Sequence, residues 1–148
     1  MTPSSAGTLL GHRLLQLGML LFLIGLLTGF AIPQLANPRM GLASHLEAVM
    51  NGLFLIVLGL VWPRLLLSAR LLSVLFWLAA YGTFANWMAT LLAAAWGAGG
   101  TMMPLAASGF DGTSLQEAVI AALLLSLSAA IVAASGLAIW GLRTSPQS

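Results

Sequence analysis

The amino-acid sequence predicts an all-α integral membrane protein, a bundle of four transmembrane helices in a single domain that covers residues 1–148. Hydrophobic residues make up 60% of the chain and charged residues only 5%, whereas a soluble domain carries about 25% charged residues. Four apolar blocks are near or above the roughly 20 residues that cross a bilayer as a helix. No segment alternates as a barrel strand would, so helices are the expected spanning elements.

Each apolar block predicts one helix, and the four helices cover about residues 14–33, 45–61, 71–96 and 115–142. The first block follows a basic flank, as a secretory signal peptide would. Its apolar stretch is long for a signal peptide, however, and Pro33 and Pro38 make a poor cleavage context. We therefore expect the first helix to be retained.

Small residues recur along one face of the first predicted helix. Gly11, Gly18 and Gly25 are seven residues apart, and Gly25 forms a GxxxG motif with Gly29. Small residues on one face allow two helix backbones to approach closely in a membrane. We expect this face to pack inside the four-helix bundle, and a contact between subunits is the alternative.

The arginines indicate how the chain is oriented. With four spans, both termini and the second connection share one side of the membrane, and that side holds Arg13, Arg64, Arg70 and Arg143. The other side holds only Arg39, to which the sequence assigns no role. Because basic residues in short loops concentrate on the cytoplasmic side, both termini are expected in the cytoplasm.

Two of the three acidic residues fit the start of a predicted helix. Ser44 with Glu47, and Ser114 with Glu117, match the S-x-x-E capping box, in which both side chains bond backbone amides of the first turn. For Glu117 we expect a cap. For Glu47 a cap and a catalytic role both stay open.

The longest connection between predicted helices covers residues 97–114. It is rich in Gly, Ala and Met, which is too apolar for a simple solvated linker. We expect it either to lie in the membrane interface or to fold over an opening as a lid.

Four polar side chains in or next to the predicted spans need another explanation. These are His45 at the start of the second helix, Asn51 more than one turn further, and Tyr81 and Asn86 in the third. One buried asparagine can be explained by an interhelical hydrogen bond worth about 0.6 kcal/mol. Four strongly polar residues in or next to the spans are harder to explain in this way, and such residues are candidates for a functional role. We predict that these four side chains form a site, with Glu47 as a further catalytic candidate.

Helical geometry separates the candidates on the second helix. Glu47 and Asn51 are four residues apart and share a face. His45 points about 120° away from Asn51, because each residue turns an α-helix by about 100°. A compact ligand on one face could not reach both within one subunit. The sequence therefore predicts a homo-oligomer whose site lies at or near a subunit boundary.

Composition and motifs exclude many classes of function. The chain has no cysteine, and its five arginines are too few and too scattered for a nucleic-acid-binding surface. No Ser/His/Asp set, HExxH motif, Walker loop or dinucleotide fingerprint is present. A closed zinc site would need more ligands than this chain offers. One histidine can, however, be the single axial ligand of a haem, whose iron then keeps an open face and can act as a Lewis acid.

Longer stretches of the sequence resemble a known family, the hydroxylaminobenzene mutases. The resemblance covers roughly residues 13 to 143 and is close in the segments PRMGLASHLEAVMNGLF, GLVWPRLLLSAR, YGTFANWMATLLAAAWGAG and MMPLAASG. These small membrane proteins rearrange hydroxylaminobenzene to 2-aminophenol in bacterial nitroarene degradation. The resemblance implies an isomerase that transfers a hydroxyl group within a small aromatic hydroxylamine. It also implies a location in the bacterial inner membrane.

The sequence is also similar, more distantly, to styrene oxide isomerase, another small four-helix membrane protein. That family shares a histidine followed six residues later by Asn-Gly, a proline, and an asparagine in the third helix, which correspond to His45, Asn51, Gly52, Pro63 and Asn86. The family is a trimer that holds haem b between subunits. The resemblance implies that His45 is the axial haem ligand and that Asn51 and Asn86 line the substrate side.

The resemblance does not assign a role to Tyr81, and two functions other than a mutase stay open. The active-site tyrosine of styrene oxide isomerase corresponds to Thr90, so a catalytic role for Tyr81 rests on its own chemistry. One alternative to a mutase is an epoxide isomerase of the styrene oxide isomerase type. The other is a non-enzymatic haem-binding or transport protein, although a haem held between two histidines would have only His12 and His45 to use.

Overall fold

The computed structural model describes residues 5–143, which contain helices and no strand. The long helices are α1 (Ser5–Ala31), α2 (Pro38–Val61), α3 (Ala69–Trp96) and α5 (Ser114–Gly141), and a short α4 (Pro104–Ala107) lies between α3 and α5. Single 3-10 turns, η1 (Ile32–Gln34) and η2 (Trp62–Arg64), follow α1 and α2. Each long helix is long and apolar enough to cross a membrane, which confirms the predicted architecture.

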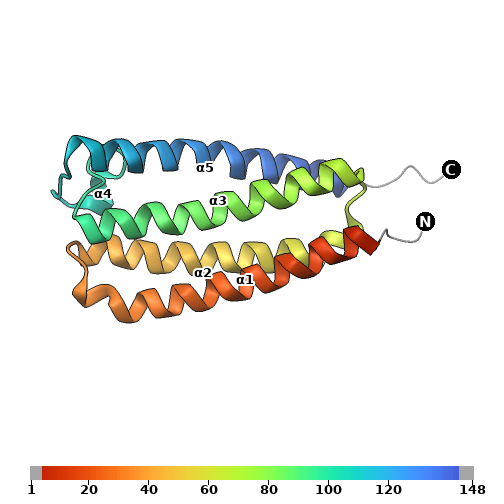
Figure 1. Cartoon of the computed structure of the whole chain (residues 1–148), viewed down its shortest axis with the longest axis horizontal. Helices are drawn as coiled ribbons and strands as arrows, with labels where there is room; N and C mark the ends of the chain where they lie inside the picture. The colour runs from red at the N-terminus through yellow and green to blue at the C-terminus, as the bar shows by residue number, and fades with distance from the viewer. Residues whose placement is uncertain (1–4, 144–148) are drawn as a thin grey trace.

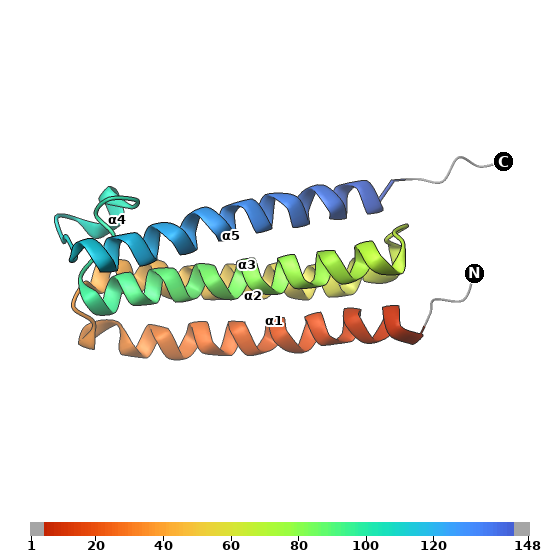
Figure 2. The same cartoon turned by 45° about the horizontal axis from the view of Figure 1, so that its top comes forward.

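The four long helices run side by side along one axis (Figure 1). α1 packs mainly on α2, α2 also packs on α3, and α3 packs on α5 (Figure 2). The described chain begins and ends at one end of the bundle, and α4 lies at the other (Figure 1). Since α2 also packs on α1 and α3 also packs on α5, the contact between α2 and α3 is the central one of the bundle.

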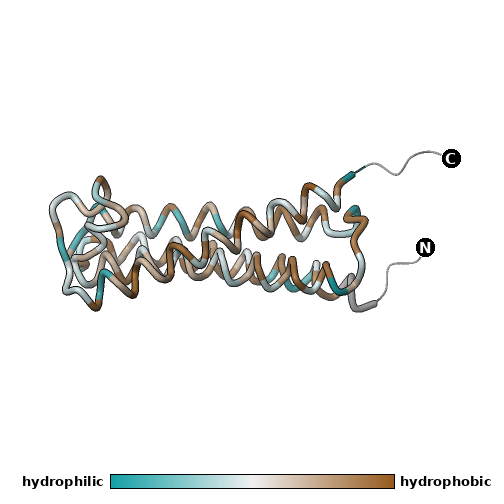
Figure 3. Tube along the Cα trace, turned by 90° about the horizontal axis from the view of Figure 1, so that it is seen from above, coloured by the Kyte–Doolittle hydropathy of each residue, from teal (hydrophilic) through white to brown (hydrophobic). Residues whose placement is uncertain are grey.

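Hydrophobic residues occur along the whole length of the four long helices (Figure 3), and many of the large ones are exposed. Phe30 is 81% exposed, Leu115 75% and Ile139 74%. Apolar surface of this extent is unfavourable in water, whereas it is the normal outer surface of a protein in lipid. The chain is therefore a multi-pass membrane protein.

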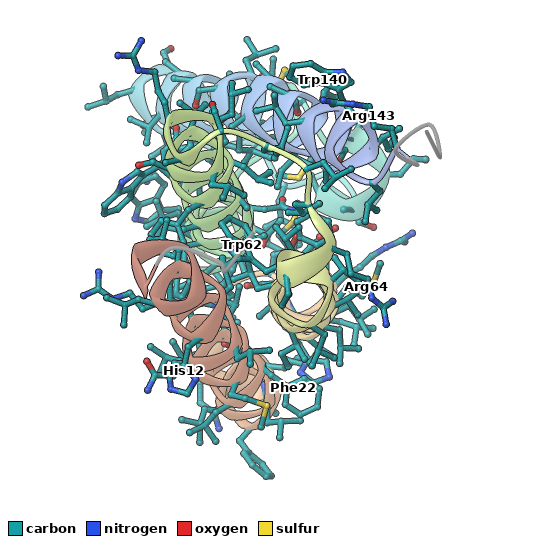
Figure 4. All side chains as sticks on the ribbon, turned by 90° about the vertical axis from the view of Figure 1, so that its right-hand side faces the viewer. His12, Phe22, Trp62, Arg64, Trp140 and Arg143 are labelled. Atoms are coloured by element: carbon teal, nitrogen blue, oxygen red, sulfur yellow. The ribbon has the colours of Figure 1, made fainter. Side chains whose placement is uncertain are left out.

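Basic side chains gather at the end of the bundle where the described chain begins and ends (Figure 4). Trp62 points between the helices there and is 3% exposed, while Arg64 points outward. The guanidinium carbon of Arg143 lies 4.6 Å from the ring centroid of Trp140. This end is the one that the arginine distribution assigns to the cytoplasm, and that orientation stays a prediction.

The glycine face of α1 packs on α2 inside the chain. A Cβ atom added to Gly18 would lie 2.7 Å from the carbonyl oxygen of Gly52, and one added to Gly52 would lie 2.7 Å from the amide nitrogen of Phe22. Contacts this short leave no room for a side chain, so glycine is needed on both helices for their backbones to approach. Packing within the bundle, the first of the two expectations for this face, is what the structure shows.

The start of α2 differs from the prediction. Asn37 caps this helix by accepting a hydrogen bond from a first-turn amide at 3.1 Å, and Pro38 takes the first position, where its missing amide is not needed. The helix therefore begins two turns before residue 45. The expected capping box of Ser44 and Glu47 is wrong, because Ser44 lies inside the helix, fully buried, and donates to a carbonyl oxygen of α3.

The predicted cap of the last helix is displaced by one residue. Thr113, not Ser114, caps α5, and Gln116 completes the capping box by accepting a hydrogen bond from the amide of Thr113. Glu117 is therefore not the capping-box residue. The boundaries of α3 and α5 agree with the predicted 71–96 and 115–142 within two residues, whereas α1 begins at Ser5 rather than near residue 14.

Glu117 holds the connection between α3 and α5. Its carboxylate accepts hydrogen bonds at 2.6, 3.1 and 3.0 Å from the backbone amides of Gly99, Thr101 and Gly112, respectively. At the same end, the side-chain amide of Asn37 donates to the carbonyl oxygen of Ala107 at 2.8 Å. Residues 97–114 are therefore a folded cover tied to α2 and α5 at one end of the bundle. Whether they lie in the membrane interface or close an opening stays a prediction.

Candidate active site on the two faces of α2

The polar residues of α2 lie on two faces of the helix, as the helical geometry predicts. Glu47 and Asn51 face α3, whereas His45 faces α1. All three side chains are half-buried. The site that the sequence predicts is thus divided between the α2–α3 contact and the α1–α2 contact.

The face toward α3 carries a cluster of three polar side chains, Glu47, Asn51 and Asn86, which we call the amide–carboxylate cluster. Oε2 of Glu47 accepts a hydrogen bond from Nδ2 of Asn86 at 2.7 Å and a second from Nδ2 of Asn51 at 3.3 Å. Asn51 reaches Glu47 because it follows one helical turn later. Asn86 comes from α3, 39 residues further along the chain. The structure therefore brings together three of the predicted site residues.

The face toward α1 carries His45. Its Nδ1 lies 2.7 Å from the carbonyl oxygen of Gly25. A carbonyl oxygen can only accept, so Nδ1 must donate, and in the neutral tautomer that does so Nε2 carries the lone pair. The ring lies against Gly29, where an added Cβ atom would be 3.0 Å from Nδ1. The glycine face of α1 thus sets both the space for the imidazole and its tautomer.

A buried network that the sequence did not predict joins three helices at the level of His45. Thr28 of α1, 6% exposed, accepts a hydrogen bond from Nε1 of Trp87 at 3.2 Å. The hydroxyl of Ser44 on α2 donates to the carbonyl oxygen of the same Trp87 at 3.3 Å. Serine, threonine and tryptophan within apolar spans were the available signal, because such groups need partners in lipid. The network fixes α1, α2 and α3 relative to one another beside the imidazole.

Tyr81 lies apart from both faces of α2. Its hydroxyl is 2.6 Å from the hydroxyl of Ser126 on α5, and the residue is 45% exposed. Five helical residues separate it from Asn86, which turns the two side chains about 140° apart. The structure therefore does not bring Tyr81 to the amide–carboxylate cluster, and its part in a reaction stays a prediction.

Thr90, which the resemblance predicts to take the place of the active-site tyrosine, does not reach the amide–carboxylate cluster with its hydroxyl group either. It is 4% exposed, and its hydroxyl donates to the backbone carbonyl oxygens of Asn86 and Trp87, both at 3.0 Å. These bonds within α3 use the one proton of the hydroxyl. In the described structure, Thr90 therefore supports the backbone of α3 beside Asn86.

The arrangement can be compared with known proteins. A family model described as styrene oxide isomerase matches residues 10–143. The chain is 57% identical over 145 residues to hydroxylaminobenzene mutase HabB of Ectopseudomonas oleovorans, which covers 98% of this chain and 88% of the relative. It is 49% identical over 117 residues to hydroxylaminobenzene mutase HabA of the same organism, covering 79% of this chain and 87% of the relative. No solved structure matches.

The family match and both identities extend over the membrane helices that carry His45 and the amide–carboxylate cluster. The likeness is thus one of whole membrane domains rather than of a short motif. Mutases of this kind are isomerases, because their substrate and product have the same molecular formula. The chain therefore belongs to the styrene oxide isomerase family and is an isomerase related to the hydroxylaminobenzene mutases.

Proposed function

We propose that this isomerase rearranges hydroxylaminobenzene, or a close arylhydroxylamine, to the ortho-aminophenol in the bacterial inner membrane. The observation that carries the proposal is the identity of 57% to HabB over almost the whole chain. The apolar bundle also suits an aromatic substrate that partitions into lipid. The reaction breaks the N–O and one ortho C–H bond and forms an ortho C–O and an N–H bond, so atoms and electrons balance without a co-reactant.

The amide–carboxylate cluster suits the polar end of such a substrate. A hydroxylamine carries N–H and O–H donors, and Asn51 and Asn86 carry amide groups that can bind them. Both asparagines lie on the α2–α3 contact and are held by Glu47. Their part in the reaction is to bind and orient the N–O group while the apolar helices exclude water that would otherwise capture a reactive species.

Haem b is the cofactor that the proposal includes, with His45 as its axial ligand. The geometry of His45 fits this role, because the Nδ1 contact with the carbonyl oxygen of Gly25 leaves Nε2 as the ligating atom. When bound, haem would supply Lewis acidity toward a substrate oxygen. The chain's contribution at this face is to hold the imidazole ring in one tautomer and one orientation.

The proposal also includes a homo-oligomer, which the geometry of α2 supports, with a trimer as the proposed state. His45 and the amide–carboxylate cluster face opposite neighbours of α2. One substrate that uses both therefore needs His45 of one subunit and the cluster of another. A trimer is the assembly that the likeness to styrene oxide isomerase implies.

The test is to supply hydroxylaminobenzene to membranes that contain the protein and to assay 2-aminophenol. The proposal expects formation of 2-aminophenol that membranes without the protein do not support. With ¹⁸O in the hydroxylamine, the label is expected in the product, because the hydroxyl group moves within the molecule. Exchange of most of the label with water would contradict intramolecular transfer.

Epoxide isomerisation is the second candidate, and the family match over residues 10–143 favours it. Styrene oxide supplied to the same membranes distinguishes the two functions. Conversion of styrene oxide without conversion of hydroxylaminobenzene would replace the proposed function with this one.

A further inference from the structure

One carboxylate oxygen sets the orientation of two amide side chains in the amide–carboxylate cluster. Both Nδ2 atoms, that of Asn51 and that of Asn86, donate to Oε2 of Glu47. A side-chain amide has donors on one side and an acceptor on the other. Because a carboxylate oxygen only accepts, each asparagine must turn its nitrogen toward Glu47. Each Oδ1 is consequently directed away from Oε2 of Glu47.

The two Oδ1 atoms are available to a ligand. Among residues 5–143, no hydrogen bond reaches Oδ1 of Asn51 or of Asn86. The only fully buried side-chain polar atom without a partner in this part of the chain is Nε1 of Trp62, so each Oδ1 keeps some exposed surface. The cluster thus presents two acceptors without a protein partner on the α2–α3 contact.

We propose that Glu47 is a positioning residue that makes the cluster selective for ligands that donate hydrogen bonds. An arylhydroxylamine has two donors, N–H and O–H, whereas an epoxide oxygen can only accept. The inference rests on the proposed function and adds to it the reason why this chain would prefer a hydroxylamine to an epoxide. Glu47 acts here through the two asparagines and needs no contact with the substrate.

The expected loss of ligand affinity follows from the free energy that one hydrogen bond contributes to binding. Each donor removed from the ligand should weaken binding by about fivefold, which is the effect of one neutral hydrogen bond at a site that is not fully buried. Suitable probes are aniline, N-methylaniline and N,N-dimethylaniline, which carry two, one and no N–H donors and cannot rearrange because they have no N–O bond.

The decisive variants are Glu47→Met and Glu47→Gln, with dissociation constants measured by calorimetry in detergent. Methionine removes the acceptor, so both amides can rotate and the discrimination between the parent ligand and its analogues should fall toward unity. Glutamine keeps one acceptor oxygen for the two Nδ2 atoms and should retain the discrimination. Ser128→Ala on the exposed face of α5 is the control and should match the wild type.

The ratio of dissociation constants within one variant does not depend on how much of the protein is folded. If Glu47→Met does not fold, Asn51→Ala replaces it, since Asn86 still donates to Glu47 at the shorter distance of 2.7 Å. That variant should lose discrimination against one analogue and keep it against the other. Unchanged discrimination in Glu47→Met or Asn51→Ala, or its loss in Glu47→Gln, would overturn the inference.

The outcome separates this inference from the proposed function. A wild-type protein that forms no 2-aminophenol overturns the proposed function. A wild-type protein that forms 2-aminophenol but binds the three ligands with equal affinity overturns only the role of Glu47.

Discussion

Nδ1 of His45 lies 2.7 Å from the carbonyl oxygen of Gly25 on α1. The imidazole ring packs against Gly29, which lies one turn further along the same helix. The backbone of α1 therefore orients the proposed haem ligand, and no second side chain is needed for this purpose. The GxxxG motif of α1 has two uses, since it permits close helix packing and makes space for the ring.

Gly29→Ala should disturb His45 while leaving the bundle assembled. The new Cβ atom would lie 3.0 Å from Nδ1, so the ring must shift. The shift needed is smaller than the displacement of about 1 Å that can cost about 100-fold in rate, so we expect mutase activity to fall by less than about 100-fold. Gly11→Ala is the matched control, because its Cβ atom would be equally close to side-chain atoms of Trp62, far along α1. Equal activities of the two variants would contradict the role of Gly29.

His45→Ala should abolish haem binding. Nε2 of His45 is the ligating atom that the Gly25 contact leaves available. The measurement is the visible absorption of the detergent-purified protein, whose Soret band should be present in the wild type and lost in the variant. His12→Ala should keep the band, since His12 is not the proposed ligand. A colourless wild-type preparation with full mutase activity would refute the haem proposal.

Gly52→Ala should destabilise the protein without altering a polar group of the site. Its Cβ atom would lie 2.7 Å from the amide nitrogen of Phe22 and 2.8 Å from the carbonyl oxygen of Gly18, both backbone atoms of α1. Overpacking of this kind typically costs about 1–3 kcal/mol. Thermal unfolding in detergent should show a lower Tm than the wild type. Gly136→Ala, with nothing within 4 Å of its Cβ atom, should not lower the Tm.

Glu117→Ala should loosen the cover at residues 97–114. The substitution leaves three backbone amides without the acceptor that they share, and hydrogen bonds to a charged group contribute about 1.5–3 kcal/mol each. Hydrogen exchange should therefore become faster at the amides of Gly99, Thr101 and Gly112. Glu117→Gln keeps an acceptor oxygen and should show a smaller change. Unaltered exchange in Glu117→Ala would mean that the cover is held by its apolar contacts alone.

Several features of the protein could be predicted from the sequence because they depend on local or additive properties. The number of membrane helices follows from the length of the apolar blocks. The separation of His45 from Glu47 and Asn51 follows from the pitch of one helix. The start of α2 could not be placed in this way, because the cap formed by Asn37 and Pro38 lies before the apolar block begins.

Only the tertiary structure decided which residues meet across helices. It paired Glu47 with Asn86, His45 with the carbonyl oxygen of Gly25, and Tyr81 with Ser126. In a soluble helix the apolar stripe indicates the buried face. A helix in lipid is apolar all round, so its pattern does not show which face turns inward. That rotation is decided by close backbone packing at small residues and by the need of each polar group for a partner.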